Sequence, residues 1–393
     1  MFQGKILFLM FSTDGKIMKK HIYVDNAATT ALDHEAFEAM IPWLTENYGN
    51  ASQLYSLARA PKKALQDARE IIASCINASP DEVFFTSGGT ESDNWAIKGA
   101  AYASPQKKQV ITSSIEHHAV LNSCEALVTQ GYLVKKLDVT TSGEVKIDLL
   151  DSFLSETPTS LVSIMTANNE IGTIQGCINP DTAKRIHRVG SLFHTDAVQA
   201  VGHIPVDVKS MGVDLLSASA HKFHGPKGIG FLFVKKGSIL QSFMNGGAQE
   251  RRMRAGTENV ASIVGMSIAL KNCCESFETT NSHLNALKDR LLSLLEYSNI
   301  KYRVNGTNPL PGLVSISFPG FDGESILHRM DLMGICVSTG SACNSSSTEI
   351  SHVLKAISLD EDSAKGTIRI SFGRDNSMND VDEIYASLAK ILL

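Results

Sequence analysis

The stretch LLSASAHKFHGPKGIGFLFV, residues 215–234, predicts two strands joined by a short turn. Both of its ends are apolar runs of a length that is typical of buried strands. Between them, Gly225 and Pro226 signal a turn that returns the chain into the second strand. Lys222 follows the first strand directly, so we expect it at the edge of the sheet where ligands bind in open α/β folds.

Similar apolar runs occur throughout the preceding part of the chain and alternate with helical patterns, of which residues 91–103 and 180–190 are examples. Several runs are too apolar for strands with one face in water. The alternation predicts an α/β fold with a mostly parallel seven-stranded sheet that is covered by helices on both faces. The five earlier runs are VFF (83–85), VIT (110–112), YLVKKL (132–137), LVSIM (161–165) and LFHT (192–195).

After about residue 260 the pattern changes to a long helical stretch, residues 260–296, followed by shorter strands and a final helix that begins near Val381. This change predicts a second, smaller α/β domain. The expected strands there are IKYRV (300–304), LVSIS (313–317), ICVS (335–338) and TIRISF (367–372).

The composition of the 393-residue chain is that of an ordinary globular protein, with 43% hydrophobic and 20% charged residues. A net charge of −5 argues against nucleic acid or an anionic membrane as the main partner. The seven cysteines form no CxxC pair, so neither a metal site nor a disulfide framework is predicted, and a cytoplasmic location fits best.

The N-terminal apolar run, Ile6 to Phe11, is shorter than the core of a usual signal peptide and too short to span a bilayer. We expect residues 1–17 to be an upstream extension or an arm. The sequence leaves open whether Met18 is the true start.

FFTSGGTESDN, residues 84–94, predicts a strand, a glycine turn and the start of a helix. Glycine lets the backbone approach an anion, and the N-terminus of a helix offers unpaired N–H groups. Gly89 and Thr90 are therefore candidates for a phosphate cup, although a plain turn with a capping threonine has a similar sequence. The motif is neither a Walker loop nor a GxGxxG fingerprint, which argues against ATP and NAD.

Asp196 ends another predicted strand, and Gln199 follows three residues later on the same side of a helical turn. An aspartate at this position either faces the ligand or caps a helix, which is the commoner role. Lys222, beside Ser219 and His221, is held between two strands; an amine kept from bulk water can attack a carbonyl. Lys227, in the turn itself, is the competing lysine.

A phosphate cup, a strand-end aspartate and a confined lysine, in this order, are the set that pyridoxal 5'-phosphate requires. The lysine forms a Schiff base, and the aspartate keeps the ring nitrogen protonated, so that the ring accepts electrons. A flat side chain over the ring is also needed, and IEHHAVL (115–121) offers His117 and His118 just after a strand.

STGSACNSSS, residues 338–347, places Cys343 among small and hydroxylated residues. A structural cysteine normally has apolar neighbours, whereas an accessible thiol is the reactive kind. The stretch alone fits a tolerated loop cysteine and a nucleophile equally. We expect Cys336, in an apolar run, to be buried and inert.

Taken together, these motifs resemble those of the cysteine desulfurases, which are pyridoxal-phosphate enzymes of the class-V aminotransferase kind. The matching motifs run in order from about residue 22 to the C-terminus, so they cover nearly the whole chain. They are YVDNAATT (23–30), TSGGTESDN, IEHHAV, ANNEIGTIQ (167–175), HTDAVQ, SAHKFHGPKGIG, GGAQERRMRAGTENV (246–260), STGSACNSSS and TIRISFGR (367–374).

The resemblance implies a role for each matching residue. Lys222 would hold the cofactor, Asp196 would pair with its ring nitrogen and Gln199 with its ring hydroxyl, and His117 would stack on the ring. The phosphate would be bound by Gly89, Thr90, Ser219 and His221, and by Thr257 of a partner subunit, since the family forms homodimers with shared sites. Asn169 and Arg369 would hold the substrate carboxylate, and Cys343 would be the nucleophile.

The resemblance also implies the fold and the reaction. The fold would be that of the type I pyridoxal-phosphate transferases, with a large domain over residues 31–264 and a small domain built from residues 1–30 and 265–393. L-Cysteine would become L-alanine, and its sulfur would pass through a persulfide on Cys343 to an acceptor for iron–sulfur cluster assembly or tRNA thiolation. The flanks of Cys343 are similar to those of the branch with a long mobile cysteine loop.

Two alternatives are weighed beside this interpretation. The first is a selenocysteine lyase, or another lyase or transaminase of the same fold, although a transaminase needs no thiol such as Cys343. The second is a non-catalytic sulfur-relay or assembly protein, which the occupied cofactor positions argue against. The acceptor and the preference between cysteine and selenocysteine are not determined by the sequence, and no direct membrane partner is expected.

Overall fold

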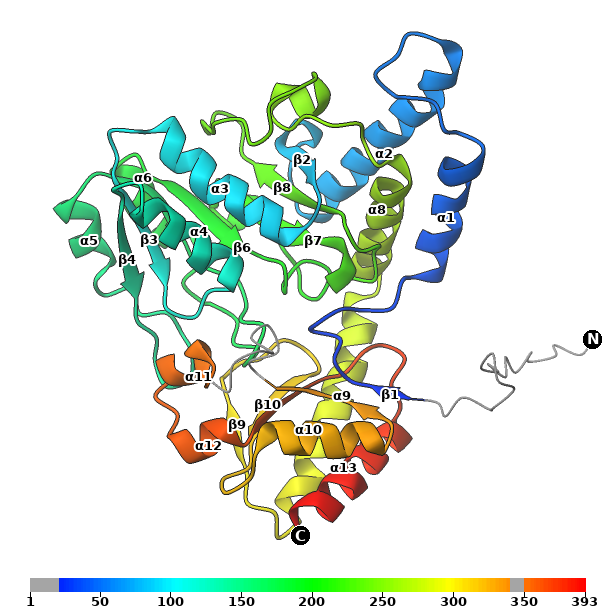
Figure 1. Ribbon diagram of the computed structural model, residues 1–393, viewed down its shortest axis with the longest axis vertical. Helices are drawn as coiled ribbons and strands as arrows, with labels where there is room; N and C mark the ends of the chain where they lie inside the picture. Colours follow the sequence, from blue (N-terminus) through cyan, green and yellow to red (C-terminus); the bar gives the residue numbers. More distant parts are fainter. Residues whose placement is uncertain (1–20, 340–349) are drawn as a thin grey trace, which may run out of the picture.

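The computed structural model describes residues 21–339 and 350–393. Along the longest axis, one part contains the large sheet and the other contains a smaller sheet with helices α9, α10 and α13 (Figure 1). Helix α8 lies in the first part, and α9 leads from it into the second part. Throughout the described ranges, each helix is too short or too polar to cross a membrane.

Thirteen strands are assigned in the described residues. They are β1 (Ile22–Tyr23), β2 (Val83–Thr86), β3 (Gln109–Ser113), β4 (Leu133–Leu137), β5 (Thr159–Ser163), β6 (Leu192–Asp196), β7 (Leu215–Ser219), β8 (Gly230–Val234), β9 (Arg303–Asn305), β10 (Leu313–Ser317), β11 (Ile335–Cys336), β12 (Ser338–Thr339) and β13 (Thr367–Ser371).

The described α-helices are α1 (His34–Thr45), α2 (Arg59–Cys75), α3 (Gly89–Ala103), α4 (His118–Val128), α5 (Leu150–Glu156), α6 (Pro180–Arg188), α7 (Val208–Met211), α8 (Val260–Glu275), α9 (Phe277–Glu296), α10 (Gly323–Leu332), α11 (His352–Ala356), α12 (Glu361–Lys365) and α13 (Met378–Leu392). Four 3₁₀ turns accompany them: η1 (Ser56–Ala58), η2 (Pro80–Glu82), η3 (Ala220–Lys222) and η4 (Gln249–Arg252).

The large sheet has seven strands in the order β2-β8-β7-β6-β5-β3-β4. Strand β8 is antiparallel to both of its neighbours, and the other pairs are parallel. These strands coincide with the seven predicted apolar runs, so the predicted α/β fold with a mostly parallel sheet is confirmed. The carboxyl ends of its parallel strands meet at one edge, where ligands of such folds bind.

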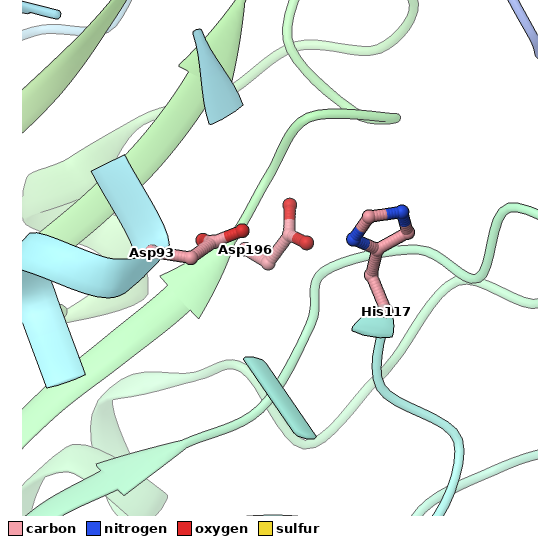
Figure 2. Close-up of side chains that lie close together, drawn as sticks. All are labelled: Asp93, His117 and Asp196. Carbon is pink, nitrogen blue, oxygen red and sulfur yellow. The ribbon is translucent and has the colours of Figure 1, made fainter. Parts of the chain in front are cut away.

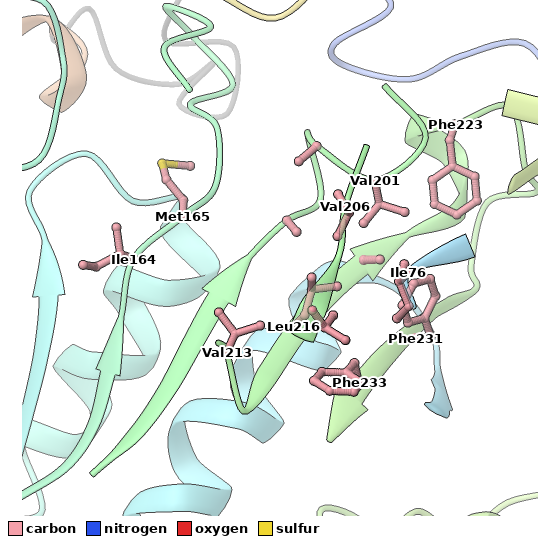
Figure 3. Packing of buried hydrophobic residues seen from close by; sticks show 14 of the residues in the cluster. Ile76, Ile164, Met165, Val201, Val206, Val213, Leu216, Phe223, Phe231 and Phe233 are labelled. Atoms are coloured by element: carbon pink, nitrogen blue, oxygen red, sulfur yellow. The ribbon is translucent and has the colours of Figure 1, made fainter. Parts of the chain in front are cut away.

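Both faces of this sheet are buried, because alternate side chains of a strand point to opposite faces. Leu216 packs with residues of α2 and α8, whereas its neighbour Leu215 packs with residues of α3 and α4. Figure 3 shows Leu216, Phe231 and Phe233 together in the first of these two clusters. Two helical layers therefore hold the strand ends in fixed positions.

A four-stranded sheet in the order β12-β13-β10-β9 has its own hydrophobic cluster, which also includes residues of α9, α10 and α13. The start of the described chain joins this part, because β1 pairs in parallel with β11. Asp25 then forms a bridge with Ser371 at the end of β13. The N-terminal segment is thus attached to the last third of the chain.

Three details differ from the sequence predictions. The helical stretch 260–296 is two helices, because the backbone at Ser276 leaves the helical conformation and its hydroxyl donates to the Asn272 carbonyl oxygen. Strand β9 begins at Arg303, three residues later than predicted. The run ICVS forms two short strands in different sheets instead of one.

Candidate active site

A cavity of about 530 Å³ lies at the carboxyl ends of the parallel strands. Its volume is within the range of roughly 300–1,000 Å³ that is usual for ligand and cofactor sites. Most of the predicted site residues line it, although they come from distant parts of the chain. They are Gly89, Thr90, His117, Asn169, Asp196, Gln199, Ser219, His221, Lys222 and Arg369.

Lys222 lies in η3, directly after β7, and its side chain reaches into this cavity. Its Nζ donates to the carbonyl oxygens of Ala27 and Ala28, at 2.7 and 2.8 Å. Lys227, the competing lysine, is exposed in the following turn and does not line the cavity. Of these two lysines, Lys222 is therefore the one positioned to meet a ligand there.

Asp196 is the last residue of β6 and is buried beside Lys222. Burial raises its pKa to about 6, against the lowering effects of the Val198 N–H, which donates to Oδ1 at 2.9 Å, and of the Lys222 charge. Turns instead of a helix follow it, so Asp196 does not cap a helix. Gln199, in these turns, donates its Nε2 to the Ala27 carbonyl oxygen at 2.9 Å.

His117 precedes α4 and caps it, because its Nδ1 accepts a hydrogen bond from the Ala119 N–H at 3.1 Å. Burial, followed by the charges of Lys222 and His118, lowers its pKa to about 4. The ring is therefore neutral and carries its proton on Nε2. Its Nδ1 or Nε2 lies within 4.8 Å of a carboxyl oxygen of Asp196 (Figure 2).

At the predicted phosphate cup, three segments of the chain approach one another closely: the glycine turn before α3, the end of β7 and the turn after β6. Gly88 caps α3 with a φ of 149°, and a Cβ on it would lie 3.4 Å from the Ser219 hydroxyl oxygen. A Cβ on Gly89 would lie 2.5 Å from a methyl group of Val198, so any larger residue would force Val198 or the glycine turn to shift. The first N–H groups of α3 have no partner within the helix and can bind an anion at this end of the cavity.

His221 and Thr257 differ in how they relate to this cup. His221 lines the cavity, and its Nδ1 lies 3.2 Å from the Thr29 hydroxyl oxygen. Burial lowers its pKa to about 4, followed by the charges of Lys222 and Lys227. Thr257 is exposed and does not line the cavity of its own chain.

Arg369 and Asn169, predicted to hold a carboxylate, lie together. The Arg369 Nη1 donates to the Asn169 carbonyl oxygen at 2.6 Å, and its Nη2 donates to the Asp25 carboxylate at 2.6 Å. Its Nε is buried and has no hydrogen-bond partner among the described residues. A buried donor without a partner is costly, and a ligand oxygen nearby would relieve that cost.

Several buried acids at this site were missed in the sequence. Glu116 accepts from the Ser113 hydroxyl at 2.5 Å and from the Met165 N–H at 2.9 Å, and burial raises its pKa to about 8. Glu170 accepts from the Ser351 hydroxyl at 2.5 Å, and burial raises its pKa to about 7. Glu116 and Glu170 are next in sequence to His117 and Asn169, which were predicted. This adjacency is the one sequence signal that could have identified them.

Asp93 and His352 also line the cavity and were likewise missed, and so does His118, the alternative to His117 in the sequence analysis. The rings of His118 and His352 lie 4.9 Å apart, and His352 Nε2 is 2.9 Å from the Glu116 carbonyl oxygen. Asp93 lies four residues into α3, at a position where a polar residue is normally solvated.

Cys343, the predicted nucleophile, lies outside the described residues. The prediction for Cys336 was wrong in part, because this thiol is half-buried instead of buried. The reason is that β11 forms only a two-stranded sheet with β1. Burial nevertheless raises the pKa of Cys336, as do the nearby Asp331 and Asp25 carboxylates, so its reactive thiolate form is disfavoured.

These residues fit pyridoxal phosphate. The N-terminus of α3 and the glycine turn suit its phosphate, the Lys222 amine suits its aldehyde, and Asp196 suits its ring nitrogen. The neutral His117 ring supplies a flat surface on which the cofactor ring can stack. The glycine contacts support the fit most directly, since a Cβ at Gly89 would fill the cradle.

Comparisons with known proteins agree with this geometry. A family model described as aminotransferase class-V matches residues 22–384. A cysteine desulfurase IscS of Methanosarcina thermophila is 46% identical over 375 residues, covering 95% of this chain and 92% of the relative. A protein of the same name from Clostridium botulinum is 44% identical over 387 residues, covering 95% of each. A solved NifS-like protein superposes with a TM-score of 0.88 at 37% identity, covering 95% of this chain and 99% of that chain.

Proposed function

The chain belongs to the aminotransferase class-V family and is a pyridoxal-phosphate-dependent cysteine desulfurase, and from this premise we propose how its residues divide the work. The substrate is L-cysteine, and the products are L-alanine and a sulfur atom held by the protein. The observation that carries the proposed roles is the position of Lys222, directly after β7 in a cavity also lined by Asp196 and His117.

Arg369 and Asn169 bind the substrate carboxylate, which fixes the direction in which the amino acid enters. A planar guanidinium suits a carboxylate because its N–H groups match two oxygens at once. The hydrogen bonds from Arg369 to Asp25 and to the Asn169 backbone hold the guanidinium in place before the substrate arrives.

Bound pyridoxal phosphate supplies an electron sink for the pair of electrons that is left on the substrate when its bonds break. Asp196 accepts the hydrogen bond of the ring nitrogen, Gln199 contacts the ring hydroxyl, and His117 covers the ring. Gly89, Thr90, Ser219 and His221 hold the phosphate. Lys222 would anchor the group covalently, and its amine would move the proton at the substrate Cα.

Cys343 takes the sulfur. Its thiolate attacks the sulfur of bound cysteine, the carbon–sulfur bond breaks, and a persulfide stays on Cys343 while the remaining carbon takes up a proton to become alanine. We propose that this sulfur then passes to an acceptor protein for iron–sulfur cluster assembly or tRNA thiolation. The support for Cys343 is its sequence setting and the resemblance of its flanks.

We further propose a cytoplasmic homodimer in which Thr257 completes the phosphate site of the partner subunit. The position of Thr257, exposed and outside the cavity of its own chain, supports this proposal, because it leaves the side chain available to a partner's site. The proposed domains are residues 31–264 and, for the small domain, 1–30 with 265–393. The hydrophobic cluster around the four-stranded sheet and the pairing of β1 with β11 support a separate small domain. Helix α8 beyond residue 264 and the segment 353–364 pack instead in the cluster of the large sheet.

The anchoring role of Lys222 is tested by borohydride reduction of the loaded enzyme, followed by peptide mapping. The reduced adduct is expected on Lys222, and Lys222→Ala should bind the cofactor loosely and lose catalysis. Lys227→Ala is the matched control and should behave as the unmodified enzyme. An adduct on Lys227 would show that the wrong lysine has been assigned.

The nucleophile is tested separately. Cys343→Ala should retain cofactor binding and yet form almost no alanine from L-cysteine, since no thiolate attacks the substrate sulfur. Cys336→Ala, the matched control, should stay active. Mass spectrometry of the enzyme after turnover should find the added sulfur on Cys343, and a persulfide on Cys336 would overturn the assignment.

A further inference from the structure

A second carboxyl group, that of Asp93, lies behind Asp196. Asp93 belongs to α3, and its side chain points toward Asp196, which in turn faces His117 (Figure 2). One carboxyl oxygen of each aspartate and one ring nitrogen of His117 lie within 4.8 Å of one another. His194 lies two residues before Asp196 on β6, so both side chains point to the face of the sheet that α3 covers.

The surroundings of Asp93 do not favour a negative charge. Its Oδ1 is buried and has no hydrogen-bond partner in the described part of the chain. The nearest imidazole nitrogen, His194 Nε2, is 3.6 Å away and also lies 3.0 Å from the Ser217 hydroxyl oxygen. Burial lowers the pKa of His194 to about 3, so this ring is neutral and gives Asp93 no positive charge.

The titratable groups that face Asp93 come from three elements. Strand β6 presents Asp196 and His194, the segment after β3 presents Glu116, and the start of α4 presents His117, whose ring is neutral. Burial raises the pKa of Asp93 well above its ordinary value, followed by the Asp196 charge, and the Glu116 charge acts in the same direction. A hydrogen bond with Ser217 opposes them. The burial of Asp93 and the negative charges near it therefore both favour its protonated form.

We propose that Asp93 keeps its proton when the cofactor is bound and acts as a positioning residue, so that Asp196 alone of the two aspartates carries the negative charge that pairs with the ring nitrogen. The proposal rests on the proposed pairing of Asp196 with the ring nitrogen. One carboxylate balances one protonated ring nitrogen, whereas a second buried carboxylate would repel Asp196 and compete for its proton. Two acids in different environments then have two roles, one charged and one neutral.

The first test uses the full chain, depleted of cofactor and titrated with pyridoxal phosphate by fluorescence. Asparagine is nearly the same shape as a protonated aspartic acid, so Asp93→Asn should bind the cofactor within about threefold of the unmodified chain. Asp196→Asn removes a charge-assisted hydrogen bond and should weaken binding about tenfold to hundredfold. Equal weakening in the two variants would overturn the proposal.

The second test is the pH dependence of thermal unfolding, which a purely structural role would not change. A folded-state pKa above the unfolded value of about 3.9 means that stability is lost as pH rises through the interval between the two values. Asp93→Asn lacks this loss, so its melting temperature relative to the unmodified chain should increase with pH across that interval. A difference that is independent of pH would contradict a protonated Asp93.

Asp93→Leu serves if the asparagine variant does not fold, because leucine is also uncharged and of similar size. The absorption of the bound cofactor should then keep the pH profile of the unmodified enzyme, whereas a profile shifted to lower pH by one unit or more would show that Asp93 had been ionised. The underlying proposal, that Asp196 pairs with the ring nitrogen, fails by a different result. If Asp196→Asn binds the cofactor as tightly as the unmodified chain, the role of Asp196 itself is rejected.

Discussion

Replacement of Arg369 by lysine tests how the substrate carboxylate is recognised, because the two side chains differ in their number of hydrogen-bond donors. A guanidinium has five N–H donors, of which two bind the Asn169 carbonyl oxygen and Asp25. The remaining donors suffice for both oxygens of a substrate carboxylate. A lysine ammonium has three donors, so the same two contacts leave it one.

Arg369→Lys should therefore lose one of two charge-assisted hydrogen bonds to L-cysteine. Such a bond is worth about 1.5–3 kcal/mol, which corresponds to a decrease of roughly 10- to 150-fold in kcat/KM. The decrease should come mainly from KM if the bond is made equally in the bound substrate and the transition state. Alanine formation over a range of L-cysteine concentrations gives both constants.

Arg374→Lys is the matched control, because Arg374 pairs with Asp33 at 2.8 Å and does not line the cavity. It should leave kcat/KM nearly unchanged. Inhibition by L-alanine and by its methyl ester separates charge recognition from other effects, since the ester has no carboxylate. If Arg369→Lys weakens both inhibitors equally, Arg369 does not recognise the carboxylate and the reasoning fails.

Three further outcomes are expected. Burial raises the pKa of Glu116 to about 8, so the free energy of unfolding should decrease by up to about 5 kcal/mol as pH rises from about 4.3 to 8. Glu116→Gln should flatten this pH dependence in denaturant titrations. Ser351→Ala should cost about 1–3 kcal/mol, measured in the same way, because it removes the cap of α11 and leaves Glu170 without its hydroxyl partner. Thr257→Ala should remain a dimer by sedimentation yet bind the cofactor more weakly, and mixing it with Lys222→Ala subunits should create hybrids with one intact site; a fully active monomer would refute shared sites.

Six of the seven strands of the large sheet were predictable from sequence because both of their faces are buried; the edge strand β4 is the exception. Runs such as GFLFV in β8 are then apolar throughout and cannot be mistaken for loops. The same logic placed Asp196 and Lys222 at the strand ends, because Asp196 is the last residue of one buried strand and Lys222 lies three residues after another. Where one edge of a strand is free, as in β9 and β11, the apolar signal is short and the bounds were misjudged.

The missed acids show what sequence patterns do not contain. Asp93 lies among Glu, Ser and Asn in a helix start, which suggests an exposed face, yet the packing of α3 on β6 and β7 buries it. Glu116 was not selected as a candidate because the two histidines that follow it were the residues chosen from that segment. Burial of a single polar residue depends on which elements pack together, and one sequence does not give that arrangement. Thr257 and Cys343 stay predictions, the first because it concerns a partner subunit and the second because it lies outside the described residues.

The contact between Asp25 and Arg369 has a consequence for biosynthesis. The two residues are 344 positions apart, and the carbonyl groups that hold the Lys222 amine belong to the same N-terminal segment as Asp25. At about 5–20 residues per second, a ribosome needs roughly 20–70 seconds to add the arginine after the aspartate. The strands of the large sheet, the last of which ends at Val234, are thus synthesised long before this wall of the pocket, and a chain cut short before residue 369 lacks the arginine that completes it.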